Sequence, residues 1–186
     1  TPASTANLLL NPGFESSTNF QNWSNWANSS VTTTAGEFRS GSKGAKADGT
    51  SDWAGFGQDV AVTPGQYITV SFWAKTTNPG AMPVVGYKFF TSSFAELQSM
   101  ITADVTTGTF TKYTLNAVAP PSAAYIQIVV STSKGGILYV DDLEVTRSTG
   151  CISTASGTVT VSNATLNMGT LAVSGCIDHP IQDVAT

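Results

Sequence analysis

The acidic side chains are the first residues in this sequence whose types and spacing could do chemistry. Only 11% of the 186 residues are charged, and four of them are glutamates. Glu15 is notable because it follows an apolar run in the stretch NLLLNPGFESS. It is either a solvated turn residue or one half of a pair whose partner lies far away in the sequence.

The other reactive groups argue against an enzyme. Hydrolysis through a carboxylate pair needs two facing acids, one of them with a raised pKa. Glu15 and Glu144 belong to two motifs far apart in the sequence, and Glu37 and Glu96 have no recognisable context. The single histidine, His179, lies beside a proline, and no nucleophile elbow, phosphate loop or metalloprotease helix motif occurs. We therefore predict no catalytic activity.

Two cysteines, Cys151 and Cys176, lie 176 − 151 = 25 residues apart in a chain whose composition is typical of secreted proteins. We predict that they form a disulfide, which on a chain-entropy model stabilises the fold by about 3 kcal/mol. A zinc site is not expected, because the chain has one histidine and no CxxC motif.

Composition favours a secreted β-protein and excludes several classes of partner. Glycine, serine, threonine and asparagine replace many of the charges of an average soluble domain, which has about 25% charged residues. The net charge of −4 and the pI near 4.7 give no electrostatic reason to bind nucleic acid or an anionic membrane. No apolar run approaches the ~20 residues of a membrane span. No signal peptide is present, so residues 1–6 are interpreted as a mature terminus or a linker.

Short β-rich runs separated by Gly, Pro, Asn and Ser must position these side chains. In Tyr67–Lys75 aliphatic residues alternate with aromatic and hydroxyl residues, and Ala123–Ser131 behaves similarly. Such two-faced strands favour an all-β jelly-roll sandwich of two antiparallel sheets, one with an accessible concave surface. The segment Phe94–Ala103 is ambiguous, and its Ala95–Met100 part could form a short helical turn. The strands are expected at Leu8–Leu10, Val31–Thr34, Ala45–Ala47, Gly57–Val62, Tyr67–Thr76, Val84–Phe90, Phe110–Ala117, Ala123–Ser131 and Ile137–Thr146.

The character of the sequence changes after Arg147. Every Trp, Tyr and Phe lies before this point, whereas the remainder has none. We place a domain boundary near Ser148 and predict one β-sandwich over residues 7–148. Residues 149–186 form either a short disulfide-closed β extension packed on the sandwich or the start of a following domain.

Three motifs occur in an order shared with a known family. They are NLLLNPGFES near the start, GQDVAVTPGQYITVSFWAK in the middle and GGILYVDDLEV further on. On these motifs the sequence resembles the extracellular carbohydrate-binding modules of the family-four/nine/twenty-two type, which are β-jelly rolls with a galactose-binding-like fold. The resemblance covers roughly Asn7 to Arg147 and not the cysteine-containing tail. It implies a non-catalytic module that binds a polysaccharide and targets an attached secreted glycoside hydrolase or lyase.

The resemblance also implies a structural Ca²⁺ site. Its ligand positions match Gly13 and Glu15 of the first motif, a loop around Ser40 and Lys43, and Asp141 of YVDD. Ca²⁺ takes six to eight oxygens and mixes carboxylates with backbone carbonyls, so the set is chemically suitable. Some relatives have an acid where this sequence has Ser40, which predicts weaker binding. The competing interpretation is that Glu15 is solvated and that Asp141 pairs with a Lys or Arg.

A sugar site needs flat aromatic rings for the C–H faces of the sugar and polar groups for its hydroxyl rim. The resemblance implies that Trp53 is a sugar-stacking residue and that Phe94 is a loop aromatic in contact with ligand. Trp26, which lies among amides, is a second candidate platform. Tyr87, on the strand before Phe94, is a further candidate for the sugar-binding surface, and Gln127 is the amide expected on the cleft-facing side.

Other residues of the same types have structural interpretations. Trp73 either lines the cleft floor or fills a second small core against the tail, and its role stays open. Trp23 is expected in the core, and Gln58 shares its strand face with Val60 and Val62. The loop STSKGG has no aromatic where xylan-binding relatives carry a Tyr, so specificity for xylan does not transfer directly.

The sequence thus predicts a secreted, calcium-stabilised carbohydrate-binding module. Its expected partners are a polysaccharide and a covalently attached catalytic domain, with no nucleic acid or membrane partner. The alternative is a structural or adhesive module of a cell-surface protein, in which the same fold serves as a spacer or a protein contact. The two differ in ring exposure, because a binder should present at least two solvent-open rings on one concave face.

Overall fold

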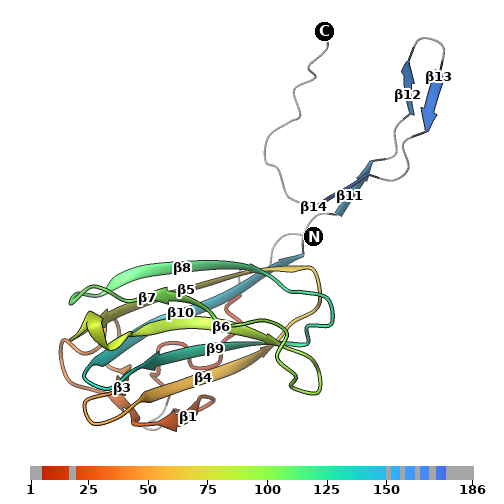
Figure 1. Cartoon of the computed structure of the whole chain (residues 1–186). Coiled ribbons are helices and arrows are strands. Elements are labelled where there is room, and N and C mark those ends of the chain that lie inside the picture. Colours follow the sequence, from red (N-terminus) through yellow and green to blue (C-terminus); the bar gives the residue numbers. More distant parts are fainter. Residues whose placement is uncertain are drawn as a thin grey trace. The chain divides into compact units, whose positions relative to one another are not determined.

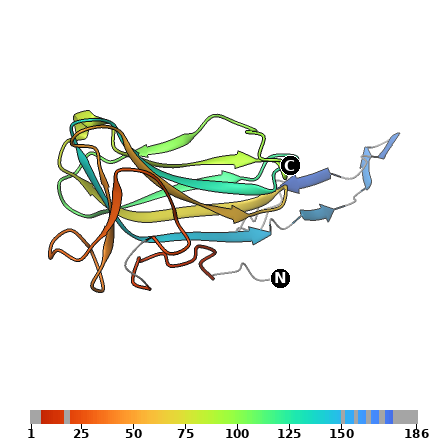
Figure 2. The same ribbon diagram turned by 90° about the horizontal axis from the view of Figure 1, so that it is seen from below.

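Alternating apolar residues place one side of each long strand in a shared core, and the strands form two antiparallel five-stranded sheets (Figures 1 and 2). This arrangement confirms the predicted all-β sandwich. The chain divides into a first unit, Thr1–Ser148, and a second unit, Thr149–Thr186. The computed structural model describes residues 6–16, 20–149, 152–155, 158–161, 164–167 and 171–174.

The first sheet has the strand order β1-β4-β9-β6-β7, and the second sheet has the order β2-β3-β10-β5-β8. A short 3-10 helix, η1 (Pro79–Ala81), precedes β6. Among the described residues no helix is long and apolar enough to cross a membrane. The strands of the two sheets are β1 (Ser24–Ala27), β2 (Ser29–Thr32), β3 (Gly44–Asp48), β4 (Ala54–Ala61), β5 (Gln66–Thr76), β6 (Val84–Phe90), β7 (Ile101–Asp104), β8 (Thr111–Val118), β9 (Tyr125–Thr132) and β10 (Ile137–Thr149).

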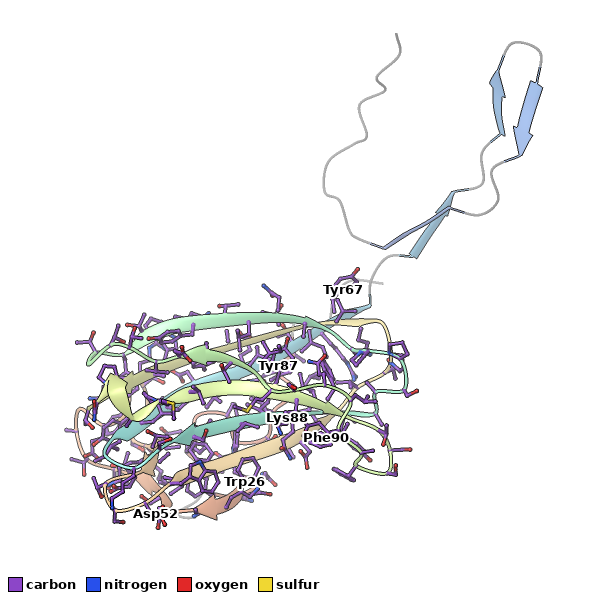
Figure 3. The ribbon with its side chains drawn as sticks, viewed as in Figure 1. Trp26, Asp52, Tyr67, Tyr87, Lys88 and Phe90 are labelled. Atoms are coloured by element: carbon purple, nitrogen blue, oxygen red, sulfur yellow. The ribbon has the colours of Figure 1, made fainter. Side chains whose placement is uncertain are left out.

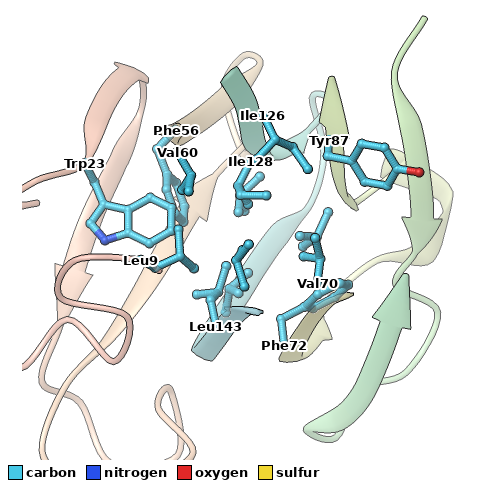
Figure 4. Packing of buried hydrophobic residues seen from close by; sticks show 14 of the residues in the cluster. Leu9, Trp23, Phe56, Val60, Val70, Phe72, Tyr87, Ile126, Ile128 and Leu143 are labelled. Carbon is cyan, nitrogen blue, oxygen red and sulfur yellow. The ribbon is translucent and has the colours of Figure 1, made fainter. Parts of the chain in front are cut away.

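The core lies between the sheets and is filled by inward-facing aliphatic and aromatic side chains (Figure 4). At one end Phe14, Phe20, Trp23 and Phe56 meet in tilted or edge-on pairs, with ring centroids 4.8 to 6.0 Å apart. Trp23 is buried and donates its indole N–H to the carbonyl of Asn11 (3.1 Å). The prediction that Trp23 is a core residue is therefore confirmed.

The predicted strand at Leu8–Leu10 does not form. The side chain of Asn7 instead donates to the carbonyl of Leu143 (2.8 Å) and accepts from the backbone N–H of Val145 (3.0 Å). The direct backbone bonds to β10 are from the N–H of Leu8 to the carbonyl of Val145 (2.8 Å) and, beyond the apolar run, from the N–H of Leu143 to the carbonyl of Pro12 (3.2 Å). The asparagine amide takes over pairing that a strand backbone would make, so the apolar run stays irregular.

The ambiguous segment Phe94–Ala103 does not contain the helical turn that was one interpretation of Ala95–Met100. Glu96 makes an isolated antiparallel bridge with Phe90, and the backbone N–H of Leu97 donates to the carbonyl of Phe89 (2.9 Å). Leu97 packs against the core from this position. The segment therefore runs back beside β6 and leads into the edge strand β7.

The second unit contains two antiparallel strand pairs, β11 (Ile152–Ala155) with β14 (Leu171–Ser174) and β12 (Thr158–Val161) with β13 (Ala164–Asn167). Cys151 and Cys176 lie outside the described residues, so their disulfide stays a prediction.

Candidate functional site

The outer surface of the first sheet gathers several exposed aromatic rings. In β4, Phe56 and Val60 face the core, so the odd-numbered residues of that strand face outward. The same alternation points Tyr125 of β9 and Phe90 of β6 outward. Figure 3 shows Trp26, Lys88 and Phe90 over this sheet. We call this surface the aromatic face and define it by Trp26, Trp53, Phe90, Phe94 and Tyr125.

Two tryptophans of the aromatic face lie across glycines of β4. A Cβ atom added to Gly55 would lie 2.6 Å from Cζ2 of Trp53, and one added to Gly57 would lie 2.4 Å from Cη2 of Trp26. Real Cβ atoms do not approach other atoms that closely, so both indoles use space that only glycine leaves open. The two residues remain 42% (Trp53) and 41% (Trp26) exposed. Both rings are therefore accessible to a ligand.

A second aromatic group lies further along the same sheet. Phe94 and Tyr125 stack with ring centroids 4.9 Å apart and 11° between their planes, and Phe90 lies 6.3 Å from Phe94. Phe94 is 54% exposed, and its backbone lies in the left-handed region with a φ of 60°, which is unusual for an aromatic residue. Tyr125 pairs with Ala61 of β4, which lies four residues (61 − 57) further along that strand than Gly57, the residue beneath Trp26. The two aromatic groups are thus about 13 Å apart along the strands.

Polar side chains occupy the interval between the two aromatic groups. The strand register places Asp59, Gln127 and Lys88 in one row across β4, β9 and β6. Gln127 donates from Nε2 to Oδ1 of Asp59 (2.9 Å), and Nζ of Lys88 pairs with Oε2 of Glu96 (2.8 Å). Gln127 therefore lies on the same surface as the exposed rings.

The aromatic face combines flat apolar platforms with hydrogen-bonding groups. The rings can pack against C–H groups of a ligand, and the amide, ammonium and carboxylate groups can bind hydroxyls. The formal charges of Asp59, Lys88 and Glu96 sum to −1, so the surface does not attract a polyanion. This arrangement suits a neutral, hydroxyl-rich ligand.

Tyr87 lies in the core and not on the aromatic face (Figure 4). It is 4% exposed, its ring meets Phe89 edge-on at 5.5 Å, and its hydroxyl donates to the carbonyl of Asn116 (3.3 Å). Burial raises the pKa of this phenol. Tyr87 shares the inward side of β6 with Val85 and Phe89, which corrects its assignment to the ligand surface.

Trp73 lies on the outer surface of the second sheet, opposite to the aromatic face. The guanidinium carbon of Arg39 lies 4.2 Å from the centroid of the Trp73 ring. Asp142 holds the guanidinium there through a 2.8 Å ion pair. Trp73 is therefore covered by a cation and does not contribute to the platform formed by Trp26 and Trp53.

A lysine covers two further rings on the same surface. Nζ of Lys75 lies 5.1 Å from the ring centroid of Phe110 and 5.0 Å from that of Tyr139, and it donates to the carbonyl of Gly36. The Tyr139 hydroxyl donates to Oε1 of Glu37 (3.1 Å), and burial together with this carboxylate raises the pKa of Tyr139 to about 12. We call this surface the covered face and define it by Trp73, Phe110 and Tyr139.

The predicted metal ligands converge on the loop between β2 and β3. Asp141 is buried, and its Oδ2 accepts from the backbone N–H groups of Arg39 (2.8 Å) and Ser40 (3.0 Å). Its Oδ1 accepts from the backbone N–H of Asp142 (2.8 Å). Burial raises the pKa of Asp141, and these hydrogen bonds offset the rise only in part. Asp141 is therefore a buried acid whose charge is incompletely compensated.

Glu15 reaches the same loop from the other side. Its Oε1 accepts from the backbone N–H groups of Ser42 (2.8 Å) and Lys43 (2.9 Å), and its Oε2 accepts from the Ser42 hydroxyl (2.8 Å). A Cβ atom on Gly41 would lie 2.2 Å from Oε1, so only glycine admits the carboxylate here. Partial burial acts to raise the pKa of Glu15, but the bonds from Ser42 and Lys43 lower it overall. Glu15 is thus an exposed acid that hydrogen bonds tie to this loop.

The chemistry of this group fits Ca²⁺. A Cβ atom on Gly13 would lie 3.8 Å from Oδ1 of Asp141 and 3.9 Å from Cγ of Glu15, so Gly13 lies beside both acids. A carboxylate offers about four lone-pair positions, and each acid accepts three hydrogen bonds, all from the loop for Glu15 and two from the loop and one from β10 for Asp141, which leaves capacity for a hard cation. The described residues contain no cluster of three or more His, Cys, Asp or Glu side chains suited to a metal. Further oxygens would therefore come from the backbone around Ser40 and Lys43.

Comparison of the sequence with family models gives one match. Residues 6–135 match the model CBM_4_9, described as a carbohydrate binding domain. A search of curated protein sequences gives no match.

Several solved structures have a similar fold. The enzymatically active domain of tailspike protein 4 from bacteriophage CBA120 matches with a TM-score of 0.62 and 22% identity over 76% of this chain and 21% of that chain. A family 16 carbohydrate-binding module matches with a TM-score of 0.59 and 22% identity, over 75% of this chain and 99% of that module. The CBM22-1–GH10 modules of Clostridium thermocellum xylanase 10B, complexed with xylohexaose, match with a TM-score of 0.59 and 21% identity. This match covers 82% of this chain and 30% of the xylanase chain. The chain thus spans only a minor part of the tailspike and xylanase chains, and identities this low show a common fold.

Sequence reasoning missed several residues of the aromatic face. Tyr125 was detectable, because it lies two residues before Gln127 on the same strand and must share its side. Gly55 and Gly57 also carried a signal, since glycine inside a strand often marks a close approach of another group. Phe90 could not be placed beside Tyr125 without the register between β6 and β9.

Proposed function

Because the chain belongs to the carbohydrate-binding domain family CBM_4_9, we propose that its aromatic face binds a polysaccharide by stacking sugar rings on exposed side chains. The family implies a non-catalytic binding role for the matched region. The observation that carries the proposal is the pair of indoles, Trp26 and Trp53, resting on Gly57 and Gly55 with about two fifths of each residue exposed.

Binding on this face requires no chemical step. The C–H faces of sugar rings pack on Trp26 and Trp53 at one end and on the Phe94–Tyr125 stack at the other. Gln127 and its row of polar neighbours bind the sugar hydroxyls between them. The glycines hold the indoles in place before the ligand arrives, which lowers the ordering cost of binding. We expect a dissociation constant in the micromolar to millimolar range, about −4 to −8 kcal/mol.

We further propose that the module is secreted and is attached to an enzyme that degrades polysaccharides. The xylanase structure of similar fold, which contains a CBM22-1 and a GH10 module in one chain, supports this arrangement. Tethering would keep such an enzyme near its polymer by raising the effective concentration of substrate. The sequence composition, with few charges and many hydroxyl residues, supports an extracellular setting.

The test is binding to a panel of soluble polysaccharides by affinity gel electrophoresis, followed by calorimetry with oligosaccharides of those that bind. Trp26→Ala and Trp53→Ala should each weaken binding about thirtyfold, because truncating an aromatic hot spot costs about 2 kcal/mol. Trp73→Ala is the matched control, since this tryptophan lies under Arg39 on the opposite sheet. It should retain wild-type affinity.

Two outcomes would overturn the proposal. One is the absence of binding to every polysaccharide in the panel, and the other is equal affinity for the wild type and both variants of the aromatic face. Either result would favour the spacer or adhesive role instead. The exposure of Trp26, Trp53 and Phe94 on one sheet supports the binding role, because a spacer has no need for accessible rings.

We also propose a structural Ca²⁺ ion at Glu15 and Asp141, with Gly13 and the backbone around Ser40 and Lys43 as further ligands. The ion would neutralise the buried Asp141 and tie the first motif to β10. Ca²⁺ at 100 times its dissociation constant should stabilise the native state by about 2.7 kcal/mol. The measurement is the melting temperature with Ca²⁺, with Mg²⁺ as a control ion, and with a chelator. Equal values under all three conditions would contradict a structural ion.

A further inference from the structure

A polar pocket lies at the edge of the sandwich, where β1 of the first sheet passes into β2 of the second. Its volume of about 390 Å³ is within the usual range of small-molecule sites, about 300–1,000 Å³. Unlike most such sites it is lined by amides, hydroxyls and one ion pair. We call it the edge pocket and define it by Asn25, Asn28, Lys46, Asp48 and Thr50.

The carboxylate of Asp48 is held in one orientation inside the edge pocket. Its Oδ1 accepts from the hydroxyl (2.7 Å) and the backbone N–H (3.2 Å) of Thr50, and its backbone N–H donates to the carbonyl of Asn28 (2.8 Å). Its Oδ2 is 3.6 Å from Nζ of Lys46, which is a loose contact. The Asp48 side chain remains 33% exposed and the Lys46 side chain 25% exposed. Both charged groups can therefore reach a ligand without losing their support.

The charges of the edge pocket select against ions. Lys46 repels a metal cation from the single carboxylate, and Asp48 repels a phosphate or sulfate from the single ammonium group. An ammonium donor and a carboxylate acceptor side by side instead match two neighbouring hydroxyls of one sugar. The amides of Asn25 and Asn28 add further hydrogen-bonding groups. The chemistry therefore fits a neutral polyhydroxylated ligand.

The edge pocket is joined directly to the aromatic face. Asn28 donates from Nδ2 to the backbone carbonyl of Trp53 (2.8 Å). The short loop after Asp48 supplies Thr50 to the pocket and then leads into Trp53. Asn25 precedes Trp26 on β1, so both tryptophan platforms have a neighbour that lines the pocket. Lys46 and Asp48 alternate with the buried Ala45 and Ala47 and therefore project from the outer side of β3, so a branch from a ligand on Trp53 would reach them around the edge of the sandwich.

We propose that the edge pocket binds a sugar substituent that branches from a polysaccharide backbone lying on the aromatic face. This inference rests on the proposed function, because the backbone must first occupy Trp26 and Trp53. The pocket holds the branch by hydrogen bonds that Lys46 donates and Asp48 accepts, and its lining offers no aromatic platform. The module therefore prefers a decorated polysaccharide to its undecorated counterpart.

The test is a nuclear magnetic resonance titration with paired probes, of which one is linear and one branched. Suitable pairs are xylohexaose with an arabinose-substituted xylooligosaccharide, and a cellooligosaccharide with a xyloglucan oligosaccharide. Indole N–H signals of Trp26 and Trp53 report the aromatic face, and side-chain amide signals of Asn25 and Asn28 report the edge pocket. Lys46→Met and Asp48→Asn remove one polar group each while keeping the side-chain volume. Lys112→Met, on β8 at the opposite edge of the second sheet, is the matched control.

We expect the branched probe of one pair to shift both sets of signals and to bind about tenfold more tightly than its linear partner. Lys46→Met and Asp48→Asn should each remove most of that preference and leave the affinity for the linear probe unchanged, and Lys112→Met should keep the preference. If indole signals respond equally to both probes and the amides stay still, the edge pocket has no such role while the proposed function stands. If no probe shifts the indole signals, the proposed function fails and this inference fails with it.

Discussion

The aromatic face and the covered face lie on opposite sides of one sandwich, and both carry aromatic rings. On the aromatic face Trp26 and Trp53 rest on glycines, and their upper surfaces remain open. On the covered face Arg39 lies over Trp73, and Lys75 lies between Phe110 and Tyr139.

The difference shows that ring type and strand alternation do not make a binding surface by themselves. The residue beneath a ring decides whether that ring can lie close to the sheet, which is the role of Gly55 under Trp53 and of Gly57 under Trp26. The adjacent loop decides whether the ring stays open, because Arg39 and Gly36 both belong to the loop between β2 and β3.

Gly57→Ala should have the largest effect, because it removes the space beneath Trp26. The new Cβ would lie 2.4 Å from the indole and 2.3 Å from the backbone carbonyl of Ile128 on β9. We expect the unfolding free energy to fall by about 1–3 kcal/mol through overpacking. Affinity for a bound oligosaccharide should fall more than tenfold, as measured by calorimetry on the folded variant.

Gly108→Ala is the control for this prediction. The nearest atom to a Cβ added there is the carbonyl oxygen of Thr76, at 3.9 Å, so the substitution meets open space. It should leave both stability and affinity near wild type. Wild-type affinity in a folded Gly57→Ala variant would show that the position of Trp26 does not matter for binding.

Phe94→Ala should have the next largest effect, because it removes the exposed half of the second aromatic group. The ring is 54% exposed and stacks on Tyr125, so its loss should cost about 1 kcal/mol of binding, which is five- to tenfold in affinity. Stability should change little. Phe110→Ala, which removes a ring from the covered face, should keep full affinity. Equal losses in the two variants would break the distinction between the faces.

Strand alternation predicted most of the sandwich and one part of the site. It correctly separated the core side of β5 from its outer side, and it placed Gln127 outward and Gln58 inward. Gln58 indeed bonds the backbone of Leu10 through both ends of its amide, at 2.8 and 2.9 Å. These features depend on local periodicity, which a sequence displays directly.

The remainder depended on contacts between distant segments. The same alternation allowed Trp73 to line a cleft, because nothing in β5 reveals that Arg39 covers it. The apolar run Leu8–Leu10 resembled a strand, yet the side chain of Asn7 made its bonds to β10. Tyr87 is different, since its alternation with Val85 and Phe89 already indicated the core.

Tyr139 gives the covered face a dependence on alkaline pH. The pKa of Tyr139 is raised to about 12 from the ordinary value of 10 by burial and by Glu37. Between these values the unfolded chain loses the phenol proton while the native state keeps it, so stability is fully present below pH 10 and declines towards pH 12. With allowance for solvent screening, the loss assigned to Tyr139 is about 1 kcal/mol.

The measurement is urea unfolding of the wild type and of Tyr139→Phe at pH 8 and at pH 11. Tyr139→Phe loses the hydrogen bond to Glu37 at both values but has no phenol to ionise. The stability advantage of the wild type should therefore shrink at pH 11. An advantage of constant size would mean that Tyr139 ionises equally readily in the native and unfolded states.

Arg39→Ala should have the smallest effect on stability and tests directly whether the cover alone separates the two faces. The lost interactions are an exposed cation–π contact with Trp73 and an ion pair whose side chains are 41% and 29% exposed, so the cost should stay below about 1 kcal/mol. The backbone N–H of residue 39 can still donate to Asp141.

The indole N–H signal of Trp73 should move in Arg39→Ala, while affinity for oligosaccharide stays at the wild-type value. One uncovered ring lacks the second platform and the polar row that the aromatic face provides through Tyr125 and Gln127. A gain in affinity that disappears in the double variant Arg39→Ala/Trp73→Ala would contradict this expectation. The two faces would then differ only in a removable cation, and the glycines of β4 would matter less than the loop between β2 and β3.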